Sequence, residues 1–382
     1  MKLDKKIMIF LGGIIWGLAG FSPEIIPSTG DGDDLIVRLL FIAVGLTFLI
    51  TNIAIKIQAK YYISLTLFII YLIVFLFINA LNTVSFNAVT REIILIIVVM
   101  VIFSILSSKK YTVFFLKGLF VSLVFLTWYY FFSIDFSLFF SPFYRLFTHL
   151  NANGIGEIGA MTFLLSYYAI FKNKQNTIKY FMIIMAIISV IVVLATRSRT
   201  SLAMILVSYF FINTYWKNNK ILIFTFIIIS VLFIKEYTTL EIVFRLDSSG
   251  VKNISNLTGR TEIWLHAFEI IKEHFLFGIG SSNAFAMVDG HKSDFHNAFI
   301  QILVTSGFLG FLPIAGILIL SFRNLLFSNN IFIIKIIFIT GLIGSFAENH
   351  LLNFGSPANL LLLISILFLS STYIKNQDME VF

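Results

Sequence analysis

Long runs of apolar residues follow one another along most of the chain, and they constrain the fold more than any other feature. A helix that crosses a bilayer needs roughly 20 apolar residues. About twelve runs approach this length, near 7–22, 35–55, 61–79, 92–106, 111–132, 154–171, 178–196, 201–216, 220–234, 296–320, 331–347 and 358–374. A β-barrel would instead show segments of about ten residues with alternating polarity. We therefore expect an all-α polytopic membrane protein with about twelve transmembrane helices.

The composition agrees with this expectation. The chain is 59% hydrophobic and 12% charged, whereas soluble domains carry about 25% charged residues. This excludes a soluble globular enzyme, and the high hydrophobicity excludes a disordered chain. The 382 residues are expected to form a single integral membrane domain, 1–382. The absence of cysteine excludes disulfides, thiolate catalysis and cysteine-ligated metals.

The distribution of lysine predicts the orientation. The formal net charge is +8, and with the N-terminus inside, most lysines fall on the cytoplasmic side, as the positive-inside rule requires. Both termini are then cytoplasmic. The longest polar segment, 235–295 between the ninth and tenth runs, becomes a large extracytoplasmic loop. In a membrane protein this excess of positive charge indicates orientation, and no nucleic-acid partner is expected.

The distribution of arginine across the membrane differs from that of lysine. All but one arginine fall on the outer side in this topology, namely Arg38, Arg91, Arg145, Arg197, Arg199, Arg245 and Arg260. The guanidinium group offers a planar fork that binds phosphate oxygens in a bidentate manner. The outer face therefore suggests a site for a phosphorylated substrate. The alternative is that these arginines pair with the outer carboxylates.

Within the loop, Thr258-Gly259-Arg260-Thr261 precedes an amphipathic run that is typical of a helix lying at a membrane surface. Its expected apolar face comprises Ile263, Trp264, Ala267, Phe268, Ile270 and Ile271. Thr258 is a candidate N-cap. Arg260 would project at the helix N-terminus, where free N–H groups already favour an anion. Gly278-Ile279-Gly280 would end the helix. A surface helix that begins with arginine is also common without any function.

A second motif opens the tenth run. His296-Asn297 is followed by nine residues and then by Gly307-Phe308-Leu309-Gly310. Histidine has an unperturbed pKa near ~6.5 and accepts a proton at neutral pH. We expect His296 to act as a general base that Asn297 or a carboxylate orients. Asn297 is also a candidate for binding a sugar hydroxyl or a backbone group. The alternative is an interfacial anchor or a helix cap.

Two more polar clusters fall on the same side. Arg197 and Arg199 lie in a very short turn between two runs that are expected to form a tight hairpin, and together they form a compact anion cradle. The segment that holds Arg145, His149 and Asn151 precedes the sixth run and is expected to line the same outer cavity. The alternative for the turn is two cations that are solvated by water.

No cofactor is expected. His291 and His296, with Asp289 and Asp294 nearby, match no standard metal-site spacing. Phosphate-binding glycine motifs in a suitable context are also absent from the sequence. The energy for a reaction would then come from a bond of the substrate itself.

The order of these motifs resembles the O-antigen ligase and O-antigen or capsular polysaccharide polymerase superfamily of bacterial membranes. The resemblance is carried by the arginine turn, the Gly-Arg-x-x-x-Trp element at Gly259–Trp264, and the His-Asn-x9-Gly-x-x-Gly element at His296–Gly310. It is strongest over about 140–320.

The resemblance implies a metal-independent, inverting glycosyltransferase that uses an undecaprenyl-diphosphate-linked oligosaccharide at the outer leaflet. It assigns catalytic roles to His296, Arg260 and Arg199, and diphosphate binding to Arg199 and Arg260. Arg197 and Arg145 are added as diphosphate-binding candidates, and Asn297 and Asn151 as substrate-orienting ones. The enzyme would act in the bacterial cytoplasmic membrane with its active face in the periplasm, and a chain-length regulator is an implied partner.

Three functions remain open at this stage. A polymerase would transfer one lipid-linked glycan onto another, and the resemblance alone favours this function. A ligase would transfer the glycan to lipid A–core through the same residues. A flippase for lipid-linked oligosaccharides would also have about twelve spans, but it should carry cations deep in a central cavity, and we expect no ionisable residue at a bilayer midplane.

Overall fold

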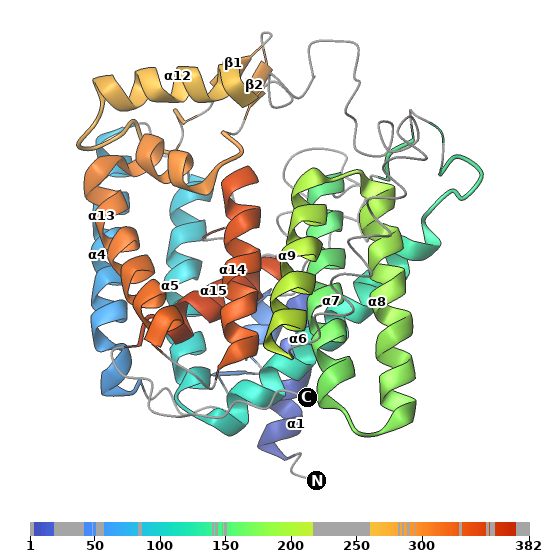
Figure 1. Ribbon diagram of the computed structural model, residues 1–382. Coiled ribbons are helices and arrows are strands. Elements are labelled where there is room, and N and C mark those ends of the chain that lie inside the picture. The colour runs from blue at the N-terminus through green and yellow to red at the C-terminus, as the bar shows by residue number, and fades with distance from the viewer. Residues whose placement is uncertain are drawn as a thin grey trace.

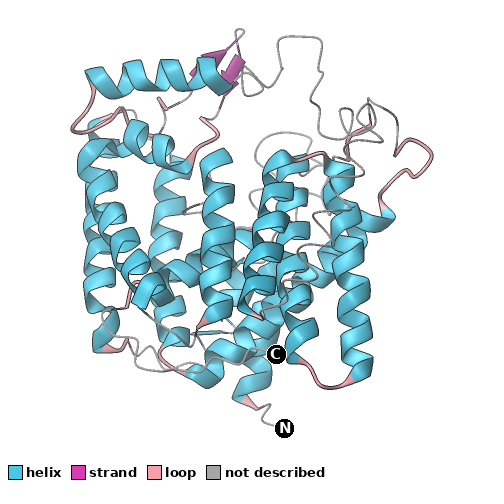
Figure 2. Ribbon diagram, in the orientation of Figure 1, coloured by secondary structure: helices cyan, strands magenta, loops and turns pink. Residues whose placement is uncertain are grey.

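The computed structural model describes residues 4–18, 42–47, 49–50, 57–82, 86–139, 141, 144–146, 148, 151–216, 260–281, 283–284, 286–288, 291–293, 295–327, 331–348, 351 and 356–371. These residues form a helical bundle, and one helix, α12, lies across one end of it (Figure 1). Helix dominates the described part of the chain, where Figure 2 shows only one pair of short strands. The all-helical class expected from the sequence is therefore confirmed.

The helices follow the apolar runs closely. Those before the long loop are α1 (Lys5–Gly17), the one-turn helix η2 (Ala59–Tyr61), α4 (Tyr62–Leu81), α5 (Phe86–Leu106), α6 (Lys109–Phe132), α7 (Ala152–Lys172), α8 (Asn176–Thr196) and α9 (Arg199–Tyr215). Those after it are α12 (Arg260–Glu273), α13 (Ala298–Phe327), α14 (Phe332–Ala347) and α15 (Pro357–Leu369). Strands β1 (Ala286–Val288) and β2 (His291–Ser293) pair in an antiparallel manner. The expected span 220–234 lies outside the described residues, and 35–55 is described only at 42–47 and 49–50.

Five of the described helices are long and apolar enough to cross a membrane, by length and composition: Ala59–Leu81, Lys109–Phe132, Ala152–Lys172, Asn176–Thr196 and Ala298–Phe327. Shorter apolar helices occupy Ile93–Leu106, Phe332–Ala347 and Pro357–Leu369. Large apolar side chains are exposed along the bundle, for example Ile73 of α4 and Ile187 of α8, and lipid is the solvent that suits such a surface. The full number of spans and their orientation stay predictions.

Helix α15 forms the centre of the bundle. All of its residues are buried, and it contacts α5, α6, α7, α13 and α14. A helix that is apolar on every side lies in a protein core or in a membrane, and here the neighbouring helices cover it. Its C-terminal carbonyl groups are bound by neighbouring helices: Ser64 Oγ donates to Ser370 O at 2.7 Å, and Asn324 Nδ2 donates to Leu369 O at 2.6 Å.

Small residues allow α1 and α6 to approach closely. A Cβ atom on Gly13 would lie 2.7 Å from Phe115 O, and one on Gly118 would also collide with the backbone of α1. The pair Gly13 and Gly17 has the spacing of a helix-packing motif. The interpretation of this spacing as a packing signal is confirmed.

The tight hairpin expected between 178–196 and 201–216 is also confirmed. Helix α8 ends at Thr196 and α9 begins at Arg199, so that two residues connect them. Arg197 adopts a left-handed conformation with φ 50°. Ser198 caps α9, since its Oγ accepts a hydrogen bond from Ser201 N at 3.3 Å. Both helices pack against α7.

Candidate functional site

The carboxylate of Glu348 joins three segments of the chain that are far apart in the sequence. Glu348 directly follows α14, and its side chain is only 6% exposed. Its Oε1 accepts a hydrogen bond from Arg260 Nη2 at 2.8 Å and another from Asn153 Nδ2. Its Oε2 lies 3.1 Å from His296 Nδ1. The site thus combines the loop helix α12, the start of α13, the start of α7 and the end of α14.

This position is electrostatically unfavourable for a carboxylate by itself. A negative charge at a helix C-terminus faces the negative end of the helix dipole, and burial adds a desolvation cost. The cation of Arg260 and the hydrogen bonds from Asn153 and His296 offset these costs. A buried charge that needs three partners from distant segments is typical of a functional site.

His296 is held in a fixed orientation. Its backbone is left-handed, with φ 48°, between the buried residues Phe295 and Asn297. Its side chain is 34% exposed. A carboxylate only accepts hydrogen bonds, so the neutral imidazole carries its proton on Nδ1, facing Glu348. The lone pair is then on Nε2, which is the arrangement that a general base requires.

Asn297 binds backbone groups, which is one of the two roles that the sequence suggested for it. Its Oδ1 accepts hydrogen bonds from Phe299 N at 3.0 Å and Ile300 N at 3.1 Å, which caps the start of α13. Its Nδ2 donates to Phe346 O at 3.1 Å, near the end of α14. Asn297 therefore ties α13 to α14. The carboxylate that contacts His296, which the sequence left unnamed, is that of Glu348.

Helix α12 forms where the sequence predicted it, and it is docked on α13. Ile263 and Ala267 are buried against Phe295 and Val304, and Trp264 Nε1 donates to Phe295 O at 2.9 Å. Of the expected apolar face, Phe268 does not pack against the protein and is 51% exposed. Phe268 points away from the face that packs. The expected N-cap Thr258 lies outside the described residues.

Two glycines join the end of α12 to a break in α13. Gly307 has φ 60° and ψ −168° inside α13, and Gly278 has φ 66°. Phe308 N donates to Phe275 O at 2.8 Å, and Ile279 N donates to Val304 O at 2.9 Å. The break in the helix frees these groups, and the turn after α12 satisfies them. The glycine spacing of the sequence motif therefore builds the corner that places Arg260 near His296.

We expect Gly307→Ala to destabilise this corner. The backbone conformation of Gly307 is essentially restricted to glycine and costs another residue about 1–3 kcal/mol. A Cβ atom there would also lie 2.4 Å from Leu276 O. The melting temperature of the purified protein should fall, together with activity. Gly316→Ala is the matched control in α13, because its Cβ would meet only side-chain atoms of Leu67, at 3.2 Å or more. An unchanged melting temperature for Gly307→Ala would contradict this interpretation of the corner.

The arginine turn lies beside this site. The Arg197 side chain is buried and its Nη2 donates to Ser141 O, so this guanidinium is engaged with the preceding loop. Arg199 is the half-buried first residue of α9. It therefore stands at the N-terminal end of a helix, where backbone N–H groups and the helix dipole favour an anion.

The segment 134–146 positions Arg145. Asp135 accepts hydrogen bonds from Ser137 Oγ at 2.6 Å and Ser137 N at 2.9 Å, and these bonds hold the pKa of the Asp135 carboxyl below its usual value. Tyr144 Oη accepts from Asp135 N at 3.0 Å, and Leu146 N donates to Ala195 O at 2.9 Å. Arg145 is thus held against the end of α8.

Asn151 and Asn153, the two asparagines of this region, lie at the start of α7. Arg145 Nη2 donates to Asn153 Oδ1 at 3.1 Å, and Arg145 Nε donates to Thr196 O at 3.0 Å. Asn151 is exposed and caps α7, where its Oδ1 accepts from Gly154 N at 2.7 Å. His149 lies outside the described residues.

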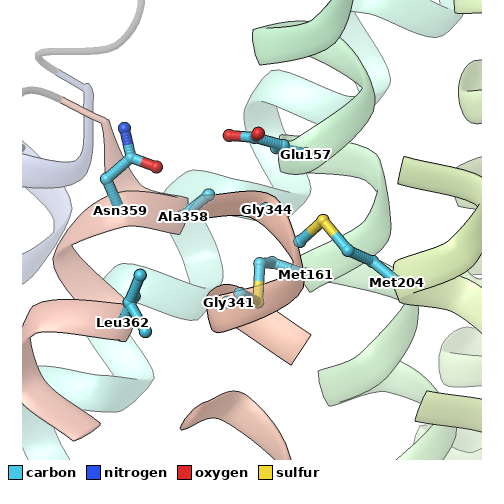
Figure 3. A pocket seen from close by; sticks show the side chains of 8 residues that line it. All are labelled: Glu157, Met161, Met204, Gly341, Gly344, Ala358, Asn359 and Leu362. Carbon is cyan, nitrogen blue, oxygen red and sulfur yellow. The ribbon is translucent and has the colours of Figure 1, made fainter. Parts of the chain in front are cut away.

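A narrow cavity lies one helical turn below the Glu348 carboxylate. Glu157 follows Asn153 by four residues on α7, and Gly344 precedes Glu348 by four residues on α14, so both belong to the same seam. Figure 3 shows the buried Glu157 carboxylate pointing toward Asn359 across this cavity. The cavity is lined by Glu157, Met161, Met204, Gly341, Gly344, Ala358, Asn359 and Leu362. Mostly apolar groups therefore separate the site from the centre of the bundle.

Among the residues that the structure describes, there is no group of three or more His, Cys, Asp or Glu residues able to hold a metal ion. The side chains of Asp289 and Asp294 are not among those described.

Sequence reasoning assigned no site role to Glu348, whereas Asn153 belongs to the segment that was expected to line the outer cavity. Each lies at the end of a helix, as an interfacial polar residue would. The only available signal was their position at the same end of the bundle as the arginines and histidines, and this signal does not specify contacts.

Residues 184–315 match the family model described as O-antigen ligase. No curated protein matches the chain. The matched stretch contains Arg199, Arg260, His296 and Gly307, whereas Glu348 lies beyond it. Over this stretch the resemblance to the O-antigen ligase and polymerase superfamily is confirmed. Together with the long apolar helices, the match indicates a multi-pass membrane protein.

Proposed function

We propose that the chain is a membrane glycosyltransferase that transfers a glycan from undecaprenyl diphosphate onto a hydroxyl group of a second lipid-linked repeat unit. It would thus polymerise O-antigen or capsular polysaccharide at the outer leaflet of the bacterial cytoplasmic membrane. The observation that carries this proposal is the shared carboxylate of Glu348, which brings a candidate base, His296, together with a fixed cation, Arg260. The family match supports the same class of reaction.

The reaction needs a base for the acceptor. The acceptor hydroxyl attacks the anomeric carbon of the donor sugar and loses its proton to Nε2 of His296. The new bond joins that oxygen to the anomeric carbon, while the bond between the anomeric carbon and the phosphate oxygen breaks. Attack from the face opposite the leaving group inverts the anomeric centre. Glu348 stabilises the imidazolium that forms.

The reaction also needs cations for the leaving group. Undecaprenyl diphosphate departs with negative charge on its phosphate oxygens, and fixed cations directed at that charge lower the barrier. Arg260 is suited to this role, because a guanidinium has five N–H groups and the bond to Glu348 occupies one of them. Arg199, at the N-terminus of α9, is the second candidate for the diphosphate. The buried Arg197 stabilises the turn through its hydrogen bond to Ser141 O.

A reconstituted reaction tests the proposal. The purified protein in liposomes is supplied with an undecaprenyl-diphosphate-linked oligosaccharide, without nucleotide and with EDTA. Glycosidic polymer with release of undecaprenyl diphosphate is the expected result. Absence of any glycosidic product would refute the transferase, and activity that is lost only with EDTA would refute metal independence.

In the same assay, Arg260→Ala is expected to lower kcat on the order of 10²–10³-fold, the usual effect of removing one fixed donor from a developing anion. Arg260→Lys should recover part of this loss, since it retains the charge without the planar fork. Lys272→Ala is the matched control, because Lys272 is an exposed cation at the other end of α12. Equal rates for Arg260→Ala and Lys272→Ala would remove Arg260 from the mechanism.

The second candidate is a ligase that transfers the glycan to lipid A–core, and the description of the matched family favours it. A deletion strain separates the two functions. Loss of a polymerase leaves single repeat units on the cell surface, whereas loss of a ligase leaves none. A chain-length regulator is proposed as a partner of the polymerase alone, so the polymer length in the reconstituted assay should change when such a regulator is added.

A further inference from the structure

A continuous series of hydrogen bonds connects the arginine turn with the Glu348 carboxylate. Thr196 O, at the end of α8, accepts from Arg145 Nε at 3.0 Å. Arg145 Nη2 donates to Asn153 Oδ1 at 3.1 Å, and Asn153 Nδ2 donates to Glu348 Oε1. The series ends at His296, 3.1 Å from the other carboxylate oxygen.

The chemistry of the side chains fixes the direction of every bond in this series. Arginine has only donors, so the oxygen of the Asn153 amide must face Arg145. The amide hydrogens of Asn153 then face Glu348, which only accepts. Without Arg145, the Asn153 amide is free to rotate and to place its oxygen against the carboxylate, and the Glu348 carboxylate would lose a partner.

We propose that Arg145 and Asn153 are positioning residues, which hold the Glu348 carboxylate in place for His296 and Arg260. This inference rests on the proposed function. It gives Arg145 a different role from the diphosphate contact that its sequence suggested. Two nitrogens of its guanidinium are directed at protein acceptors, one on α8 and one on α7.

The same contacts set the position of the arginine turn. Arg145 binds the carbonyl group of Thr196, the residue directly before Arg197, and Leu146 N donates to Ala195 O at 2.9 Å. Arg145 therefore fixes the end of α8 relative to the start of α7. Displacement of the start of α7 would move Asn153, and with it the Glu348 carboxylate, relative to His296, and small misplacements of reacting groups lower rates strongly.

Steady-state kinetics of the reconstituted enzyme test this role. In Arg145→Ala and Asn153→Ala, kcat should fall on the order of 10²-fold, while KM for the lipid-linked donor stays within about twofold of the wild type. Arg145→Lys should not restore kcat, because an ammonium group cannot span both acceptors. The double variant should be no slower than the slower single variant, since both substitutions break one series of bonds.

A matched control and a binding measurement complete the design. Asn173→Ala removes an asparagine at the other end of α7, whose Nδ2 donates only to Ala169 O within its own helix among the described residues, and its kcat should equal that of the wild type. Binding of undecaprenyl diphosphate to Arg145→Ala should also equal that of the wild type, whereas binding to Arg260→Ala should weaken.

The outcomes separate this inference from the proposed function. A raised donor KM and weakened binding in Arg145→Ala, partly restored in Arg145→Lys, would make Arg145 a diphosphate ligand and overturn the inference. A fall in kcat that disappears after correction for the folded fraction would also overturn it. If Arg145→Ala and Asn153→Ala had normal rates and the His296 and Arg260 variants were inactive, this inference would be overturned. Full activity of the His296 and Arg260 variants would instead refute the proposed function.

Discussion

Replacement of His296 by asparagine is expected to lower kcat on the order of 10²–10⁴-fold, the usual contribution of a general base. Asparagine is chosen because His296 has φ 48°, a conformation that asparagine tolerates better than alanine. Donor affinity should remain, because the cations that bind the diphosphate are unchanged. The measurement is steady-state kinetics with the lipid-linked donor, together with binding of undecaprenyl diphosphate.

His274→Asn is the matched control for this substitution. His274 is exposed and directly follows α12, at the end of the helix opposite to Arg260. Its replacement should leave kcat unchanged. If His296→Asn kept full activity with a normal melting temperature, His296 would be an interfacial anchor, the alternative that its sequence position left open.

The second large effect is expected for Glu348→Gln. The substitution keeps the shape of the side chain, but its amide can donate a hydrogen bond to Nδ1 of His296 and so favour the tautomer that has its proton on Nε2. The base would then lack a lone pair on the substrate side. In serine proteases the equivalent replacement of a buried aspartate lowers kcat by about 10⁴-fold, and we expect on the order of 10²–10³-fold here, because His296 is partly exposed.

Glu348→Gln should also lower the melting temperature. Arg260 would keep a neutral oxygen as its acceptor but lose its anionic partner while its side chain is only 19% exposed, and a hydrogen bond to a charged group contributes about 1.5–3 kcal/mol against about 0.5–1.5 kcal/mol for a neutral one. Glu269→Gln, an exposed position on α12, is the control and should change neither kcat nor the melting temperature. A Glu348→Gln enzyme with wild-type kcat would show that the carboxylate stabilises the fold without orienting His296.

The helices could be predicted because each depends on its own residues. The apolar run at 111–132 became α6 at Lys109–Phe132, and the run at 178–196 became α8 at Asn176–Thr196. The amphipathic pattern after Arg260 likewise became α12. Periodicity alone did not predict that Phe268 is exposed. The face of α12 that packs on α13 is narrower than the apolar stripe of the sequence, so the Phe268 ring lies outside the contact.

The centre of the site could not be predicted in the same way. Glu348 lies 52 residues from His296, 88 from Arg260 and 195 from Asn153. No local pattern encodes contacts across such separations, because they depend on how the helices pack. The motif at His296 suggested a base, but it did not decide whether Asn297 binds a sugar hydroxyl or a backbone group. A helix-capping asparagine and a substrate-binding one have the same local sequence.

The glycine corner between α12 and α13 has a consequence for the energetics of donor binding. Backbone hydrogen bonds, including Phe308 N to Phe275 O, join the helix that carries Arg260 to the one that follows His296. In the proposed function, the cation of Arg260 and the base His296 are therefore assembled before the donor arrives. Little of the binding energy is consumed in reorganising them, and more of it remains for the transition state.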